Sequence, residues 1–188
     1  MATGRFNKLT GQIGEYIACA ELGRQGFLAS AFSGNVPEFD LVVVDESLKS
    51  NVVQVKSIRN GNWRTDANTW MILDVLNSGH QVLRGPKLIA NPNLLYIFVA
   101  IGDASHTTSD RFFILNASEV QIAYIKSYSY YMEQKNWIRP TNPYSFDCRI
   151  NIIDIIVHEN KWEKIRDQLT GLRDKPTSAD GPPLLQTG

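Results

Sequence analysis

Four side chains in the first third of the chain have the chemistry of a metal-dependent hydrolytic site. Glu15 lies in a stretch of helical character, Asp40 enters an apolar run, and Gln54 and Lys56 stand two residues apart in the next apolar run. Carboxylate and amide oxygens are hard ligands that suit Mg²⁺, and a lysine beside them can orient a nucleophile or stabilise negative charge. These residue types together are suited to cutting a phosphodiester bond with a divalent metal.

Each of these residues has an expected role. Asp40, the side-chain oxygen of Gln54 and the backbone carbonyl of Val55 are expected to supply three ligands to Mg²⁺ or Mn²⁺. Glu15 is expected to hold a metal-bound water or to help form a second metal site. Lys56 is expected to orient or help deprotonate the attacking water. Because glutamine is neutral where a glutamate would add a charge, we expect weak metal affinity and a strong dependence on Asp40.

The helix that carries the glutamate is predicted over residues 10–25, with Gly26 as its stop. At about 100° per residue, Glu15 falls on the side of the core and Gly14 on the side facing water. A carboxylate near the core costs several kcal/mol unless it is paired, hydrogen-bonded or bound to a metal. A buried salt bridge or a capping interaction is the structural alternative to a catalytic role.

Two apolar runs, 39–44 and 52–58, predict neighbouring strands that form a hairpin. The period of two places Gln54 and Lys56 on one face of the second strand. Asp40 is then expected across the hairpin, near enough to share an ion with them and to serve as the lysine's partner. Taken alone, an aspartate here can simply mark a strand end that faces water.

The rest of the chain predicts one α/β domain over residues 1–169 and a disordered tail, rich in Pro, Gly, Ser and Asp, over 170–188. Segments 59–68 and 77–93 are expected to be irregular, because they are polar or rich in Gly and Pro. The other expected elements are strands at 27–32, 94–101 and 111–115, a strand or helix at 69–75, a helix from Ser118 towards Tyr131, a candidate strand at 150–156 and a terminal helix at 159–169.

Composition excludes little. The 188 residues carry 19 basic and 19 acidic side chains, a balance that weighs mildly against a dedicated nucleic-acid binder. We expect neither a signal peptide nor a membrane span, because no run approaches the roughly 18 apolar residues that a span needs. The two cysteines match no metal or redox spacing, and we expect them to be reduced in a cytoplasmic protein.

A polar segment after the lysine contains candidate contacts to nucleic acid. Arg59 and Arg64 could bind phosphates, and Trp63 could stack on a base. A solvated loop with one anchoring tryptophan is an equally good reading of the same residues. The tyrosine-rich stretch 124–131 is expected to be core or interface rather than a base-stacking surface.

The order of these motifs resembles the PD-(D/E)xK nuclease superfamily. The resemblance covers roughly residues 10–58 and is carried by Gly11-x-x-Gly14-Glu15, Pro37-Glu38-Phe39-Asp40 and Gln54-Val55-Lys56. The Q-x-K variant is similar to Mrr-type members, and the helix glutamate to Holliday-junction-resolvase-like members. The resemblance implies a restriction-endonuclease-like α/β fold, with a central mixed β-sheet flanked by α-helices. It also implies Mg²⁺-dependent DNA cleavage, with Asp40 as main metal ligand, Gln54 as second ligand, Lys56 as catalytic lysine and Glu15 as accessory acid.

Two departures keep alternatives open. Glu38 stands where a literal motif has an aspartate after the proline, and it shares the face of Asp40 and could compete for its role. Gln54 also fits an inactive member of the superfamily that serves as a binding subunit in a DNA defence or repair assembly. A third reading is a chance motif in an unrelated α/β protein. A homodimer is a further expectation from the resemblance, with the tyrosine-rich helix as its candidate contact.

Overall fold

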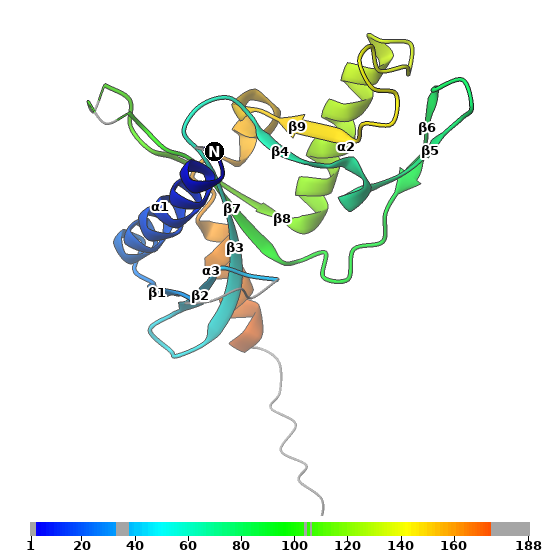
Figure 1. Cartoon of the computed structure of the whole chain (residues 1–188). Helices are drawn as coiled ribbons and strands as arrows, with labels where there is room; N and C mark the ends of the chain where they lie inside the picture. Colours follow the sequence, from blue (N-terminus) through cyan, green and yellow to red (C-terminus); the bar gives the residue numbers. More distant parts are fainter. Residues whose placement is uncertain (1–2, 33–37, 104, 106, 174–188) are drawn as a thin grey trace, which may run out of the picture.

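A five-stranded mixed sheet forms the centre of the protein (Figure 1). The computed structural model describes residues 3–32, 38–103, 105 and 107–173. The strands lie in the order β1-β2-β3-β7-β8; β3 and β7 run parallel, and the other neighbours are antiparallel. Their bounds are β1 (Leu28–Ala31), β2 (Leu41–Val44), β3 (Ser50–Ile58), β7 (Leu95–Ala100) and β8 (Arg111–Asn116). The predicted mixed sheet and the β2–β3 hairpin are confirmed.

Each face of the sheet is buried by helices, because side chains of a strand alternate between the two faces. Val53 and Val55 of β3 pack on the same side as Leu22 of α1 (Thr3–Arg24) and Ile165 of α3 (Glu163–Arg173). Tyr96 and Phe98 of β7 belong to the opposite core with residues of α2 (Ala117–Glu133). The sheet therefore lies between α1 and α3 on one side and α2 on the other, the flanked arrangement that was predicted.

Two small antiparallel pairs lie outside the main sheet. β4 (Trp63–Asp66) pairs with β9 (Asp147–Ile150), and β5 (Met71–Val75) pairs with β6 (Gln81–Pro86). Short 3₁₀ helices follow β4 and β9, at η1 (Ala67–Thr69) and η2 (Ile152–His158). Figure 1 shows the β4–β9 pair beside α2, with which it shares the second core. None of the described helices is long and apolar enough to cross a membrane.

Several of the predicted elements and element boundaries differ from those in the structure. The segments 59–68 and 77–93, predicted to be irregular, contain β4 and β6, whose partners lie far along the chain or across a tight turn. The candidate strand at 150–156 is mostly the 3₁₀ helix η2. For the segment 69–75, which was left open between strand and helix, β5 confirms the strand. Helix α3 extends to residue 173, past the expected start of the tail; the remainder of the tail and Pro37 lie outside the described residues.

Helix α1 approaches β3 very closely at Gly14. A Cβ atom on Gly14 would lie 2.3 Å from the Cβ of Ser57, a distance that real side chains do not reach. The Ser57 hydroxyl donates a hydrogen bond of 2.9 Å to the carbonyl of Thr10, which fixes the same contact. Gly14 is therefore buried, and its predicted place on the water face is wrong. The reason is that Gly14 has no side chain, so the backbone of α1 can approach Ser57 of β3 directly.

The close contact predicts opposite effects for two glycines of one helix. Gly14→Ala should lower the free energy of unfolding by about 1–3 kcal/mol, because the new methyl group forces α1 away from Ser57. Gly11→Ala, whose Cβ meets nothing within 4 Å, should raise it by about 0.5–1 kcal/mol through helix propensity. Urea unfolding followed by circular dichroism measures both. Equal stabilisation by the two alanines would contradict the close approach.

Candidate active site

The candidate site lies where β2 ends beside β3. The register of the hairpin runs from Val44 opposite Ser50 to Leu41 opposite Val53. Beyond Val53 no described strand pairs with this edge of β3, and we call residues 54–58 the open edge. The backbone N–H of Asp40 donates to the Val53 carbonyl at 2.9 Å, so the chain still follows the strand at this point.

The carboxylate of Asp40 takes the place of the missing strand. Its Oδ2 accepts a hydrogen bond of 2.7 Å from the backbone N–H of Val55, which is a buried residue. An amide N–H without a partner is costly in a buried position, so this bond is strongly favoured. No described residue donates a hydrogen bond to the other oxygen, Oδ1. One oxygen of Asp40 is therefore fixed by β3, and the second is uncommitted.

The Val55 carbonyl faces the same gap. In an extended strand the N–H and C=O groups of one residue point to the same edge, and the N–H of Val55 points to Asp40. The carbonyl oxygen of Val55 therefore points to the edge of β3 at which the Asp40 carboxylate lies. Two hard oxygen atoms in this relation suit Mg²⁺ or Mn²⁺, which prefer oxygen ligands.

Gln54 and Lys56 lie on the strand face opposite Val53 and Val55, as predicted. Gln54 is half-buried and Lys56 is exposed. Among the described residues neither side chain makes a hydrogen bond or an ion pair, so the direct pair predicted between Lys56 and Asp40 is not formed. The indole N–H of Trp63 donates to the Lys56 carbonyl at 2.9 Å and fixes the backbone below the amine. The lysine amine is therefore available for a ligand.

Helix α1 brings the carboxyl of Glu15 into electrostatic contact with the same site. Burial raises the pKa of Glu15 above its ordinary value, the negative charge of Asp40 raises it further, and Lys56 partly opposes the shift. The charges of all three residues therefore act on one another. The glycine contact between α1 and β3 explains the proximity, because Glu15 follows Gly14 directly.

Tyr96 is a site residue that the sequence did not single out. It pairs in register with Gln54 across the β3–β7 ladder. Burial raises the pKa of the Tyr96 phenol, and the charge of Asp40 adds to the shift. A phenol beside the carboxylate supplies a hydrogen-bond donor on the face that Gln54 shares. Only the parallel pairing of β3 with β7, which joins segments about 40 residues apart, reveals it.

The predicted metal ligands do not form a cluster of acidic side chains. In the described part of the chain no group of three or more His, Cys, Asp or Glu side chains is placed to hold a metal ion. The predicted set differs from such a group, because it combines two carboxylates with an amide and a backbone carbonyl. All of these atoms are oxygens, and two of them lie at the open edge. The donor atoms of this set are therefore of the type that a hard cation such as Mg²⁺ prefers.

The three residues predicted to contact nucleic acid differ in their exposure to solvent. Trp63 is 3% exposed and packs on Phe98, so its ring has no face for a base; the alternative of an anchoring tryptophan is the one that the structure shows. Arg59 is exposed. Arg64 is exposed on β4 and forms an ion pair of 3.0 Å with Asp147. Both arginines remain candidate phosphate contacts, and Trp63 is withdrawn as a base-stacking residue.

Glu38 is exposed, and with Gln54 it lines a pocket of about 400 Å³. The Asp40 carboxylate accepts a hydrogen bond from the Val55 amide, and Glu38 makes no such bond in the described structure. Asp40 is therefore preferred to Glu38 as the candidate metal ligand.

Comparisons with known proteins give a likeness of low degree. No protein-family model matches the sequence, and no curated protein matches it. Among solved structures, the chain is similar to a bacterial homing endonuclease, I-Ssp6803I, with 17% sequence identity and a TM-score of 0.48. The match covers 89% of this chain and 98% of that one. A likeness at this level carries no conclusion about function.

The raised pKa of Glu15 predicts a pH dependence of stability. The folded state holds this proton more tightly than the unfolded state, so the stabilising effect is complete below the ordinary pKa of 4.5 and is lost as the pH rises through the raised value. The free energy of unfolding of Glu15→Gln, taken relative to that of the unmodified protein, should therefore be higher at pH 7 than at pH 4. Urea unfolding at both pH values, without divalent metal, measures the difference.

Glu133→Gln, at the exposed end of α2, serves as the control and should show no such difference. A Glu15→Gln variant that loses more stability at pH 7 than at pH 4 would contradict the account. That result would mean that the ionised carboxylate is stabilised by Lys56 more than it is penalised by burial.

Proposed function

We propose that the protein is a metal-dependent endonuclease that hydrolyses phosphodiester bonds in DNA with water as the nucleophile. The single observation that supports this most is the fixed position of the Asp40 carboxylate beside the Val55 carbonyl at the open edge of β3. The charges of Glu15 and Lys56 act on the same place. Cleavage of a phosphodiester needs oxygen ligands, a cationic side chain and a proton acceptor together.

Asp40, Gln54 and the Val55 carbonyl are the proposed ligands of Mg²⁺ or Mn²⁺, and Glu15 is a further oxygen donor near them. When bound, the metal would supply a Lewis acid at the scissile phosphate and lower the pKa of a water molecule. Asp40 contributes the full negative charge among the three strand ligands, since Gln54 is neutral. The site therefore depends on Asp40 for charge and on the other two for geometry.

Lys56 is proposed to orient the attacking water and to stabilise charge on the phosphoryl oxygens. Its amine is exposed and free of ion pairs in the described structure, and its backbone is held by the Trp63 indole. Glu15 is proposed to accept a proton through its carboxylate oxygens, since its raised pKa moves it towards neutral pH, where a general base is most effective.

DNA is the proposed substrate because the resemblance to PD-(D/E)xK nucleases implies it, and because arginines follow the candidate site along the chain. Arg59 lies directly after β3, and Arg64 lies on β4. Both are exposed and can contact phosphate oxygens. The neutral net charge means that such contacts must be local rather than spread over the surface.

A binding protein without catalysis is the second candidate. The neutral Gln54 favours it, because the strand ligands then carry only one negative charge. In this case the protein would act as a subunit in a DNA defence or repair assembly, and the open edge would hold no metal. The two candidates differ in metal binding, which can be measured directly.

Removing the charge of Asp40 should abolish cleavage without unfolding the protein. Asp40→Asn keeps an oxygen that can accept the Val55 N–H, and it loses the negative charge. Cleavage of plasmid DNA with Mg²⁺ should fall at least about 100-fold, and Lys56→Met should have a similar effect. Asp74→Asn and Lys126→Met are matched controls on β5 and α2 and should retain activity. Full activity in Asp40→Asn and Lys56→Met would remove the proposal.

Restoring the missing charge should tighten metal binding. Gln54→Glu adds a second carboxylate among the strand ligands, so the dissociation constant for Mn²⁺ should fall about tenfold in isothermal titration calorimetry. Gln12→Glu adds the same charge on the exposed face of α1 and should change nothing. If the unmodified protein and Gln54→Glu both bind no Mn²⁺, or bind it independently of Asp40, the binding-protein alternative is favoured.

A further inference from the structure

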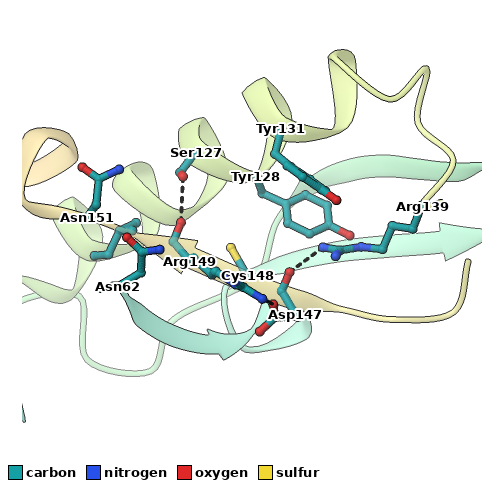
Figure 2. Close-up of a pocket in the computed structure, with 10 residues that line it drawn as sticks. Asn62, Ser127, Tyr128, Tyr131, Arg139, Asp147, Cys148, Arg149 and Asn151 are labelled. Atoms are coloured by element: carbon teal, nitrogen blue, oxygen red, sulfur yellow. Dashed lines mark hydrogen bonds and ion pairs between the residues drawn. The ribbon is translucent and has the colours of Figure 1, made fainter. Parts of the chain in front are cut away.

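A pocket of about 290 Å³ lies between α2 and the β4–β9 pair, outside the candidate active site (Figure 2). Most of the side chains that line it are polar, among them Asn62, Ser127, Arg139, Asp147, Arg149 and Asn151. Ser127 donates to the Arg149 carbonyl at 2.7 Å, which joins α2 to β9 at the pocket. The remaining hydrogen-bonding groups converge on a space the size of a small polar ligand.

The charged residues that line this pocket are Arg139, Asp147 and Arg149, and Arg64 lies beside them on β4. Arg64 and Arg149 are directly opposite in the β4–β9 register, an arrangement that is repulsive without an intervening anion. Asp147 supplies that anion: it lies 3.0 Å from Arg64 and 2.6 Å from Arg149, and the two arginines hold its pKa below the ordinary value. One carboxylate is thus shared by two guanidinium groups.

A third guanidinium has no carboxylate partner in the described structure. Arg139 lies over the rings of Tyr128 and Tyr131, with its Cζ atom 5.3 and 5.2 Å from their centres. It donates to the backbone carbonyl of Asp147, and its Nε atom is buried without a partner. A half-buried charge in this state is stabilised by a nearby anion. The tyrosine rings also hold the planar group in one orientation.

Two further carboxylates are close by but are committed elsewhere. Asp66 accepts the N–H of Asn68 at 2.8 Å, and Asp154 accepts the N–H of Asn151 at 2.8 Å. Asp66 is the N-cap of η1, and Asp154 is the N3 residue of the capping box at the start of η2. Neither forms an ion pair with Arg139 or Arg149 among the described residues, and neither lines the pocket, so the lining itself carries two guanidinium groups and one carboxylate.

The pocket also lies close to the candidate active site along the chain. Asn62, which lines the pocket, is six residues beyond Lys56, so their Cα atoms are at most about 20 Å apart. The bond from the Trp63 indole to the Lys56 carbonyl draws the two regions together. At about 3.4 Å per nucleotide along the duplex axis, 20 Å corresponds to at most about six base pairs.

We propose that the pocket of Arg139 and Arg149 is a second phosphate site, which binds the backbone of the nucleic-acid strand a few nucleotides from the bond to be cut. Planar guanidinium groups bind phosphate oxygens with paired hydrogen bonds, and the amides of Asn62 and Asn151 add neutral donors. The choice of nucleic acid rather than a free anion rests on the proposed function. The site would fix the register of the substrate on the protein.

Binding without cleavage tests the proposal. Fluorescence anisotropy of a labelled 20-base-pair duplex in EDTA should give about tenfold weaker binding for Arg149→Gln near 0.1 M salt. The slope of log K against log salt should fall by about 0.9, since one phosphate contact is lost. Arg139→Gln should act similarly, and Arg139→Lys should keep part of the salt slope while losing affinity. Arg24→Gln removes an exposed, ion-paired arginine on α1 and is the matched control.

Three results would overturn the proposal. Affinity and salt slope could remain unchanged in Arg149→Gln, which is half-exposed and should fold even if Arg139→Gln does not. The control could lose as much affinity as the pocket variants. Inorganic phosphate could shift the NMR signals of Ser127 and Asn151 while the duplex affinity stays unchanged in the Arg139 and Arg149 variants. That result would identify a free anion as the ligand. Because the assay needs no cleavage, its outcome is independent of the Asp40→Asn result.

Discussion

The candidate site depends on one hydrogen bond, from the backbone N–H of Val55 to the carboxylate of Asp40. β2 ends before it can pair with this part of β3, and a buried amide requires an acceptor. An aspartate at the entry to β2 satisfies this need with one oxygen and leaves the second at the open edge. The same contact that completes the sheet thus fixes a charged oxygen beside the Val55 carbonyl.

The close packing of α1 at Gly14 adds a second carboxyl to this edge, at an electrostatic cost. Burial and the charge of Asp40 both disfavour the ionised form of Glu15, and a single lysine offsets this only partly. A bound cation would relieve the repulsion between the two carboxylates. Such local conflicts are characteristic of functional sites, where stability is reduced in favour of an arrangement that a ligand completes.

The sequence predicted the main sheet well and the accessory parts poorly. Continuous apolar runs such as 94–101 are reliable signals of buried strands, and the spacing of Gln54 and Lys56 fixes their common face. β4 and β9 are polar on one side and pair across about 80 residues, so no local pattern marks them. Gly14 was predicted on the wrong face of its helix because the hydrophobic periodicity treats a glycine as polar. In the structure this glycine is buried against Ser57 of β3. Trp63 could not be told from an exposed aromatic, since only the tertiary fold reveals its burial.

Binding of Mn²⁺ followed by NMR is the most direct measurement of the central claim. The paramagnetic ion broadens the amide signals of nearby residues in an isotopically labelled protein. The account predicts that the signals of Asp40, Gln54, Val55 and Lys56 disappear first, together with that of Glu15, and that Asp40→Asn abolishes the effect. Broadening centred on another acidic cluster, or unchanged in Asp40→Asn, would contradict the claim that the open edge of β3 is a metal site.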